Sequence, residues 1–189
     1  MSALVVLDTN VMFNALHQRV TEQGGLDQAA LERAWRDDGK LAFSRPTMDE
    51  LALNLIRHDI HQMKGVTQFQ RHEFLGEVQS KHRSQKVEPA VHFTGCEDVE
   101  DDKIAAVALT IGSVVVTRDR KLLELSGRTV KAGPLESRFF ALHPQDYLKM
   151  QRMPLMHAFS ALANGGPAVP AVLVPRRAPS AAASVVHKP

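Results

Sequence analysis

The sequence of 189 residues contains a single cysteine, Cys96, which excludes an internal disulfide framework. It also contains no apolar run approaching the roughly 20 residues that a membrane-spanning helix needs. Its first residues lack the basic segment of a signal peptide and reach the acidic Asp8 too early for one. These absences favour a cytoplasmic protein that has no membrane partner.

Acidic residues are missing from the end of the chain. Four of the 23 Lys and Arg residues lie from Gln151 onward, where there is no Asp or Glu, which leaves 19 basic against 21 acidic residues in 1–150, a net charge of −2. A mildly acidic domain does not favour nucleic-acid binding through bulk charge. Any such function would have to depend on a local site.

Composition divides the chain into three parts. Apolar residues make up 44% of the whole, an ordinary value for a globular protein. Pro and Ala dominate residues 164–189, a composition that buries too little apolar surface to become ordered. We therefore expect one domain over 1–150, an extension over 151–163 and a Pro/Ala-rich flexible tail over 164–189.

Short apolar runs alternate with helical patterns through the first part. The run Leu4-Val5-Val6-Leu7 is typical of a buried strand in a parallel sheet, and Pro46 opens the clearest amphipathic helix. Strands are predicted at 4–7, 41–44, 114–117 and 138–142, with 85–94 left ambiguous. Helices are predicted at 11–17, 26–36, 46–63, 68–80, 101–111, 120–125 and 144–150. This alternation predicts an α/β fold with a mostly parallel sheet.

Four acidic residues stand where these strands end or where the neighbouring helices begin. Asp8 directly follows the first strand, and Glu50 lies one turn into the helix after the second. Asp101 begins the helix before the Val-rich strand, and Asp119 follows that strand by two residues. Because the carboxyl ends of parallel strands share one edge of a sheet, we expect these carboxylates to converge.

Converging carboxylates repel one another unless cations neutralise them. Oxygen donors favour Mg²⁺ or Mn²⁺, and the scattered histidines with one cysteine give no zinc-like spacing. Such cations clamp the oxygens of a phosphodiester and lower the pKa of a bound water. The pattern therefore predicts metal-dependent phosphodiester hydrolysis without a protein nucleophile.

Each acid also has a simpler interpretation. Asp8 and Asp119 fit as helix caps or turn residues, and Glu50 fits as an acid that favours the helix dipole. The acidic run that contains Asp101 offers Asp102 as well. Asp101 is the preferred ligand, and Asp102 stays open as the alternative.

Four motifs, in order, resemble those of the PIN-domain family, and the resemblance is closest to ribonuclease toxins of bacterial toxin–antitoxin pairs. They are Leu4-Val5-Val6-Leu7-Asp8-Thr9-Asn10, Ser44 through Glu50-Leu51, Asp101 through Ala108, and Val116-Thr117-Arg118-Asp119. The resemblance implies a three-layer α/β/α sandwich with a central, mostly parallel sheet, in which residues 1–150 form the nuclease domain.

The resemblance also implies an endoribonuclease that uses Mg²⁺ or Mn²⁺ to cleave single-stranded RNA. The implied residues are Asp8, Glu50, Asp101 and Asp119 as the catalytic and metal-binding quartet, Asn10 and Thr117 as supporting polar groups, and Arg118 as a candidate RNA contact. Its implied partners are RNA, a small antitoxin protein and a second copy of the chain in a homodimer.

The residues around Asp8 disfavour two other protein classes. A haloacid-dehalogenase-like phosphatase needs a second acid where Asn10 stands, and a receiver domain needs an acidic neighbour beside Asp8. A catalytically inactive PIN-like module that binds RNA or protein stays open. The basic, His-rich segment 54–89 is a candidate RNA-facing arm or dimer contact, although a solvated helical pair is the simpler interpretation.

Overall fold

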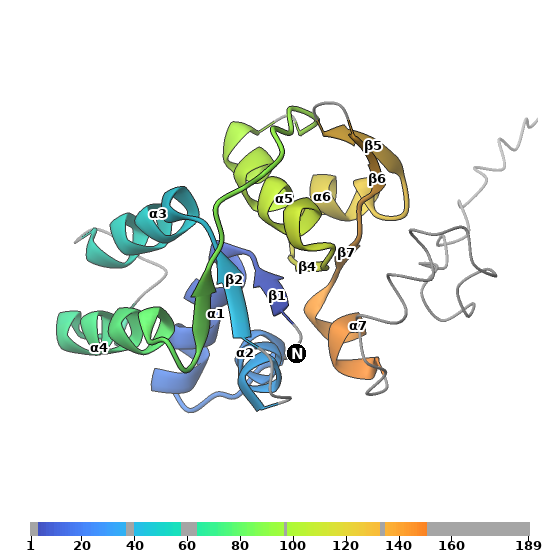
Figure 1. Ribbon diagram of the computed structural model, residues 1–189. Helices are drawn as coiled ribbons and strands as arrows, with labels where there is room; N and C mark the ends of the chain where they lie inside the picture. The colour runs from blue at the N-terminus through green and yellow to red at the C-terminus, as the bar shows by residue number, and fades with distance from the viewer. Residues whose placement is uncertain (1–3, 37–39, 58–63, 97, 133–134, 151–189) are drawn as a thin grey trace, which may run out of the picture.

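The computed structural model describes residues 4–36, 40–57, 64–96, 98–132 and 135–150 (Figure 1). Five strands form a central sheet in the order β3-β2-β1-β4-β7, and every pairing in it is parallel. The predicted α/β fold with a mostly parallel sheet is therefore confirmed. The predicted extension 151–163 and tail 164–189 lie outside the described residues.

The elements follow the predicted alternation closely. The sheet strands are β1 (Leu4–Leu7), β2 (Lys40–Phe43), β3 (Ser84–Lys86), β4 (Val115–Val116) and β7 (Ala141–Leu142), and an antiparallel pair is formed by β5 (Thr129–Ala132) and β6 (Leu135–Arg138). The helices are α1 (Thr9–Val20), α2 (Leu26–Arg36), α3 (Arg45–Ile56), α4 (Gln68–Gln79), α5 (Val99–Ile111), α6 (Arg120–Leu125) and α7 (Pro144–Lys149).

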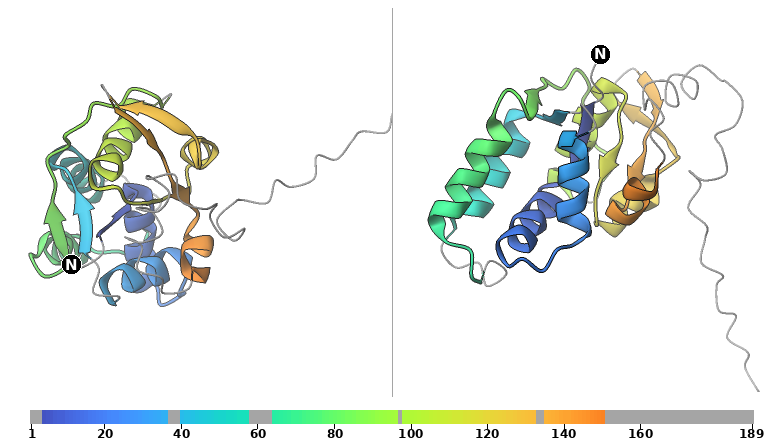
Figure 2. Two further views of the ribbon diagram at one scale, coloured as in Figure 1. Left: turned by 45° about the vertical axis from the view of Figure 1, so that its right-hand side comes forward. Right: turned by 90° about the horizontal axis from the view of Figure 1, so that it is seen from below.

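The sheet separates two hydrophobic cores. Side chains alternate along a strand, so Val5 and Leu7 of β1 join one core while Val6 joins the other. The first core contains residues of α1, α2, α3, α4 and α7, and the second contains residues of α5, α6 and β5. Figures 1 and 2 show α5 and α6 on the other side of β1 from α1 and α2, with α3 beside α4. The predicted three-layer α/β/α arrangement is confirmed.

Several element boundaries differ from the predicted ones. Helix α5 begins at Val99 rather than at position 101, because the Asp98 side chain caps it by accepting a hydrogen bond from the Glu100 amide at 2.9 Å. The ambiguous segment 85–94 contributes only the end of β3. The predicted strand 138–142 is divided between β6 and β7, and the β5–β6 hairpin was not predicted. Positions 58–63 of the predicted helix 46–63 lie outside the described residues.

The pairing of β1 with β4 brings two parts of the chain together at one edge of the sheet. Leu7 lies opposite Val116, and the Asp8 amide continues the ladder by donating to the Val116 carbonyl at 3.0 Å. Asp8 and Thr117 are thus neighbours just beyond the strand ends, although 109 residues separate them in sequence. Among the described residues, no helix has the length and apolar character needed to span a membrane.

Candidate metal centre

Asp8 is a buried carboxylate, only 2% exposed, at the carboxyl end of β1. Its Oδ1 accepts the Asn10 amide at 3.0 Å and so caps α1, while its Oδ2 accepts the Thr117 hydroxyl at 2.5 Å. Burial raises the pKa of Asp8, the two hydrogen bonds oppose that rise, and the charge of Asp119 adds to it. Asp8 therefore both caps a helix and supplies a desolvated carboxylate to this edge of the sheet.

Glu50 approaches the same edge from α3. Its Oε1 accepts the Thr9 hydroxyl at 2.9 Å, and that hydroxyl also lies 3.4 Å from Oδ1 of Asp8. Its Oε2 is buried and has no hydrogen-bond partner among the described residues. Burial, and after it the charges of Glu100 and Asp8, raise the pKa of Glu50 against the Thr9 bond. A buried carboxylate oxygen without a donor is costly, and it is a suitable ligand for a cation.

The acidic residues at the start of α5 make different contacts. Asp98 caps the helix, and Glu100 pairs with the Lys103 ammonium at 2.5 Å. Oδ1 of Asp102 accepts backbone amides from the preceding loop, including that of Cys96 at 2.8 Å. Asp102 therefore holds this loop against the helix. Asp101, in contrast, is the residue of this run proposed as a metal ligand.

The pKa of Asp101 is raised by its surroundings. Its pKa is raised to about 7, first by burial and then by the charges of Asp119, Asp8, Asp98 and Glu50, in that order. The structure thus brings Asp101 into electrostatic contact with the three other predicted site residues. Its role as a ligand in preference to Asp102 stays a prediction that this geometry favours.

Asp119 completes the set from the turn between β4 and α6. Its Oδ1 accepts the Lys121 amide at 2.7 Å and the Leu122 amide at 3.0 Å, so it caps α6. Its own amide donates to the Thr117 hydroxyl oxygen at 2.8 Å. Thr117 is fully buried and joins Asp8 to Asp119 through one hydroxyl group.

The remaining predicted residues occupy different positions. Asn10 acts through its backbone amide on Asp8, and its side chain is exposed. Nε of Arg118 donates to both oxygens of Asp27, at 2.8 and 2.9 Å. Sequence reasoning missed Thr9 and Asp27. Thr9 could have been found as the hydroxyl residue directly after the first acid, whereas the sequence around Asp27 carries no such signal.

The donor set fits a hard divalent cation. All four acids offer carboxylate oxygens, burial raises the pKa of three of them, and Glu50 has the buried oxygen without a partner. Within the described ranges, however, no three His, Cys, Asp or Glu side chains are already placed to share a metal ion. The acids surround one edge of the sheet without forming a closed ligand cage.

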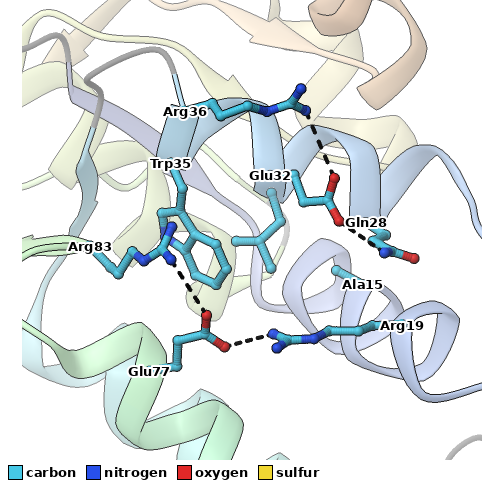
Figure 3. Close-up of a pocket in the computed structure, with 9 residues that line it drawn as sticks. Ala15, Arg19, Gln28, Glu32, Trp35, Arg36, Glu77 and Arg83 are labelled. Atoms are coloured by element: carbon cyan, nitrogen blue, oxygen red, sulfur yellow. Dashed lines mark hydrogen bonds and ion pairs between the residues drawn. The ribbon is translucent and has the colours of Figure 1, made fainter.

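The described part of the chain also has a hollow elsewhere, and it is not this site. A cavity of about 330 Å³ lies among α1, α2 and α4, with Arg19, Trp35 and Glu77 in its wall (Figure 3). The Arg83 guanidinium stacks over the Trp35 ring at 4.6 Å. None of the four acids lines this cavity.

Comparison with known proteins places the chain in a family. A family profile described as "PIN domain" matches residues 4–121, more than half of the chain. A chain of the crystal structure of VapBC2 from Rickettsia felis, bound to a DNA fragment from its promoter, is 16% identical, with a TM-score of 0.44 over 64% of this chain and 92% of that one. No curated protein sequence matches. The extent of the profile match shows that this chain belongs to the PIN-domain family.

Proposed function

We propose that this protein is a metal-dependent endoribonuclease that hydrolyses phosphodiester bonds in single-stranded RNA. The observation that carries the proposal is the way the acids are joined at one edge of the sheet: the Thr9 hydroxyl links Glu50 to Asp8, the Thr117 hydroxyl links Asp8 to Asp119, and Oε2 of Glu50 is buried without a partner among the described residues. PIN domains are typically nucleases and generally bind Mg²⁺. Neighbouring carboxylates repel one another, and a bound divalent cation would relieve that repulsion.

The proposed roles differ between the acids and the threonines of the site. Asp8, Glu50, Asp101 and Asp119 would hold Mg²⁺ or Mn²⁺. When bound, such a cation neutralises charge on the phosphodiester and supplies a water of lowered pKa. The hydroxyls of Thr9 and Thr117 orient the carboxylates of Glu50 and Asp8.

Arg118 is proposed as the RNA contact. Its side chain is 38% exposed, and Asp27 engages it through Nε. Among the described residues, no hydrogen bond occupies its terminal nitrogens, and a guanidinium is suited to binding phosphate. This contact places the RNA backbone beside the turn that carries Asp119.

Cleavage of a fluorescent single-stranded RNA by the purified full chain tests the proposal. EDTA should abolish cleavage, Mg²⁺ or Mn²⁺ should restore it, and Asp8→Asn should lower the rate at least about 100-fold. Asp146→Asn in α7, which removes an exposed acid, serves as the matched control. Full activity in EDTA, or in Asp8→Asn, would contradict the proposal.

A catalytically inactive PIN-like module that binds RNA or protein is the second candidate. The observation in its favour is that the described residues contain no three acids already placed to share a cation. Such a module would bind RNA equally well in EDTA and in Mg²⁺ and would never cut it. Gel-shift and cleavage assays on the same sample distinguish the two functions.

The biological role rests on the sequence resemblance alone. That this protein is a toxin, that a small antitoxin covers its site and that it forms a homodimer all stay predictions. Purification from native extract, followed by mass identification of the co-purifying protein and light scattering of the purified chain, tests them. A monomer without a partner would exclude these assignments.

A further inference from the structure

We propose that Asp27, on α2, is a positioning residue of the metal centre that acts through Arg118. The inference rests on the proposed function, because it names a further residue that supports the same site. Asp27 is 1% exposed, contacts none of the four acids by hydrogen bond, and nevertheless holds the side chain that precedes Asp119.

The environment of Asp27 fixes its carboxylate firmly. Nε of Arg118 donates to both oxygens, at 2.8 and 2.9 Å, and Nε2 of Gln18 donates to Oδ2 at 3.1 Å. A buried carboxylate is tolerated when it is paired and hydrogen-bonded in this way. Because Gln18 also accepts the Gln28 amide at 3.0 Å, α1 and α2 together hold the acceptor to which Arg118 is bound.

The Arg118 backbone lies in the turn that builds the site. Thr117 before it donates to Asp8 and accepts the Asp119 amide, and Asp119 after it caps α6. A shift of this turn would move Asp119 relative to Asp8, and both are proposed ligands. Hydrogen-bonding partners behind the ligands typically contribute about 10- to 100-fold to metal affinity or activity. The ion pair between Asp27 and Arg118 therefore fixes the geometry of the site from outside it.

A purely structural role for the ion pair makes a different prediction. Removing one partner of a buried pair can destabilise the fold without touching the chemistry. The test must therefore read the site itself, by kcat, by KM and by the affinity for Mn²⁺ alone, beside the melting temperature.

The experiment compares the wild-type full chain with Asp27→Asn, Arg118→Gln and the double variant. Both single variants should show kcat and Mn²⁺ affinity about 10- to 100-fold lower. KM should change less than about twofold in Asp27→Asn and should rise in Arg118→Gln, which also removes the proposed RNA contact. The double variant should be no worse than either single one, since each removes the same pair. If a single variant does not fold, the double variant, which leaves no unpaired buried charge, gives the same comparison. Glu32→Gln removes an exposed acid of the same helix and should match the wild type.

Three results would overturn the inference. A lower melting temperature with unchanged kcat and Mn²⁺ affinity would make the pair structural only. A higher KM in Arg118→Gln, with kcat and Mn²⁺ affinity unchanged in both single variants, would leave Arg118 as the RNA contact and remove the positioning role of Asp27. Additive losses in the double variant would show that the two residues act separately. A wild-type chain that neither cuts RNA nor binds Mn²⁺ would instead remove the proposed function, and the inference with it.

Discussion

Two threonine hydroxyls connect the acids of the candidate site. Thr9 donates to Glu50 and Thr117 donates to Asp8, and both threonines are almost completely buried. A hydrogen bond donated to a carboxylate favours its charged form, which opposes the effect of burial. These two hydroxyls keep buried carboxylates available as ligands where desolvation alone would favour their protonation.

Replacement of Thr117 by Val tests whether the site needs the hydrogen bonds of the hydroxyl or only the shape of the side chain. The hydroxyl donates to Asp8 and accepts the Asp119 amide, and Val preserves the shape while leaving both groups unsatisfied. The expected cost in unfolding free energy is about 1–3 kcal/mol, together with a large loss of kcat. Thr117→Ser keeps the hydroxyl and should keep most of the activity. Urea unfolding and RNA cleavage measure the two effects, and an active Val variant would contradict the role of Thr117.

Neutralising Asp101 should lower the cleavage rate far more than neutralising Asp102. Asp101→Asn removes the acid whose pKa the other carboxylates raise, so cleavage should fall at least about 100-fold while the fold is retained or stabilised. Asp102→Asn weakens the hold on the Cys96 loop and should leave most of the activity. Parallel rate and melting measurements decide between them. A severe rate loss in Asp102→Asn alone would reverse the assignment.

Sequence reasoning proposed the four acids as ligands because each stands at a strand end or a helix start, a property of local pattern. It preferred Asp101 but left Asp102 open, because the choice depends on which carboxylate accepts the loop amides of Gly95 and Cys96. Sequence reasoning missed Asp27 because its partner, Arg118, lies 91 residues away in sequence. Local pattern thus predicts where ligands stand, and the side chains that hold them come from the tertiary fold.

At the scale of the elements, the start of α3 places Glu50. Ser44 caps this helix by accepting the Thr47 amide, and the Thr47 hydroxyl oxygen accepts the Ser44 amide at 3.0 Å. Ser44 is fully buried, and it directly follows β2. The capping box therefore fixes the direction in which α3 leaves the sheet and, one turn later, the position of the Glu50 carboxylate.

Ser44→Ala should lower both stability and activity. Loss of the cap should cost about 1 kcal/mol of unfolding free energy, and the rate should fall because Glu50 is displaced. Thr67→Ala removes the corresponding cap of α4, which is exposed and carries none of the four acids. It should destabilise the protein by a similar amount at an unchanged rate. Equal rates in the two variants would show that the α3 cap does not position Glu50.

The strands and helices were predictable to different degrees. The sheet strands β1, β2 and β4 carry apolar residues that two packed layers bury, so composition identifies them. The hairpin of β5 and β6 has a largely polar sequence, and its pairing depends on strand-to-strand hydrogen bonds, which leave little trace in a single segment. The fold class was therefore predictable, and the hairpin was not.

At the scale of the whole molecule, two cores stabilise the edge on which the acids repel one another. The profile match ends at residue 121, directly after the turn that carries Asp119. Most residues of the two cores on either side of β1 lie within that match. The packing of the whole domain thus opposes a local electrostatic cost that a bound cation would relieve.

That cost should appear as a pH dependence of stability in the metal-free protein. Burial and neighbouring carboxylates raise the pKa of Asp101 from its ordinary 3.8 to about 7, so between these values the folded protein binds a proton that the unfolded chain has released. The unfolding free energy should therefore fall as the pH rises from about 4 to about 7, with the full loss present above that range. The raised pKa values of Asp8 and Glu50 act in the same direction.

Thermal unfolding in EDTA at constant ionic strength, from pH 5.5 to pH 8, measures this slope. Asp101→Asn should flatten the profile and melt above the wild type at pH 8, whereas Asp102→Asn should keep the wild-type slope. Adding Mg²⁺ at pH 8 should raise the melting temperature of the wild type, because a cation bound only by the folded protein stabilises it by mass action. The wild type and Asp101→Asn differ at one side chain, so the difference between their profiles isolates Asp101. Identical slopes in the wild type and in Asp101→Asn would mean that the carboxylates do not oppose one another at this edge of the sheet, and the case for a cation there would lose its physical basis.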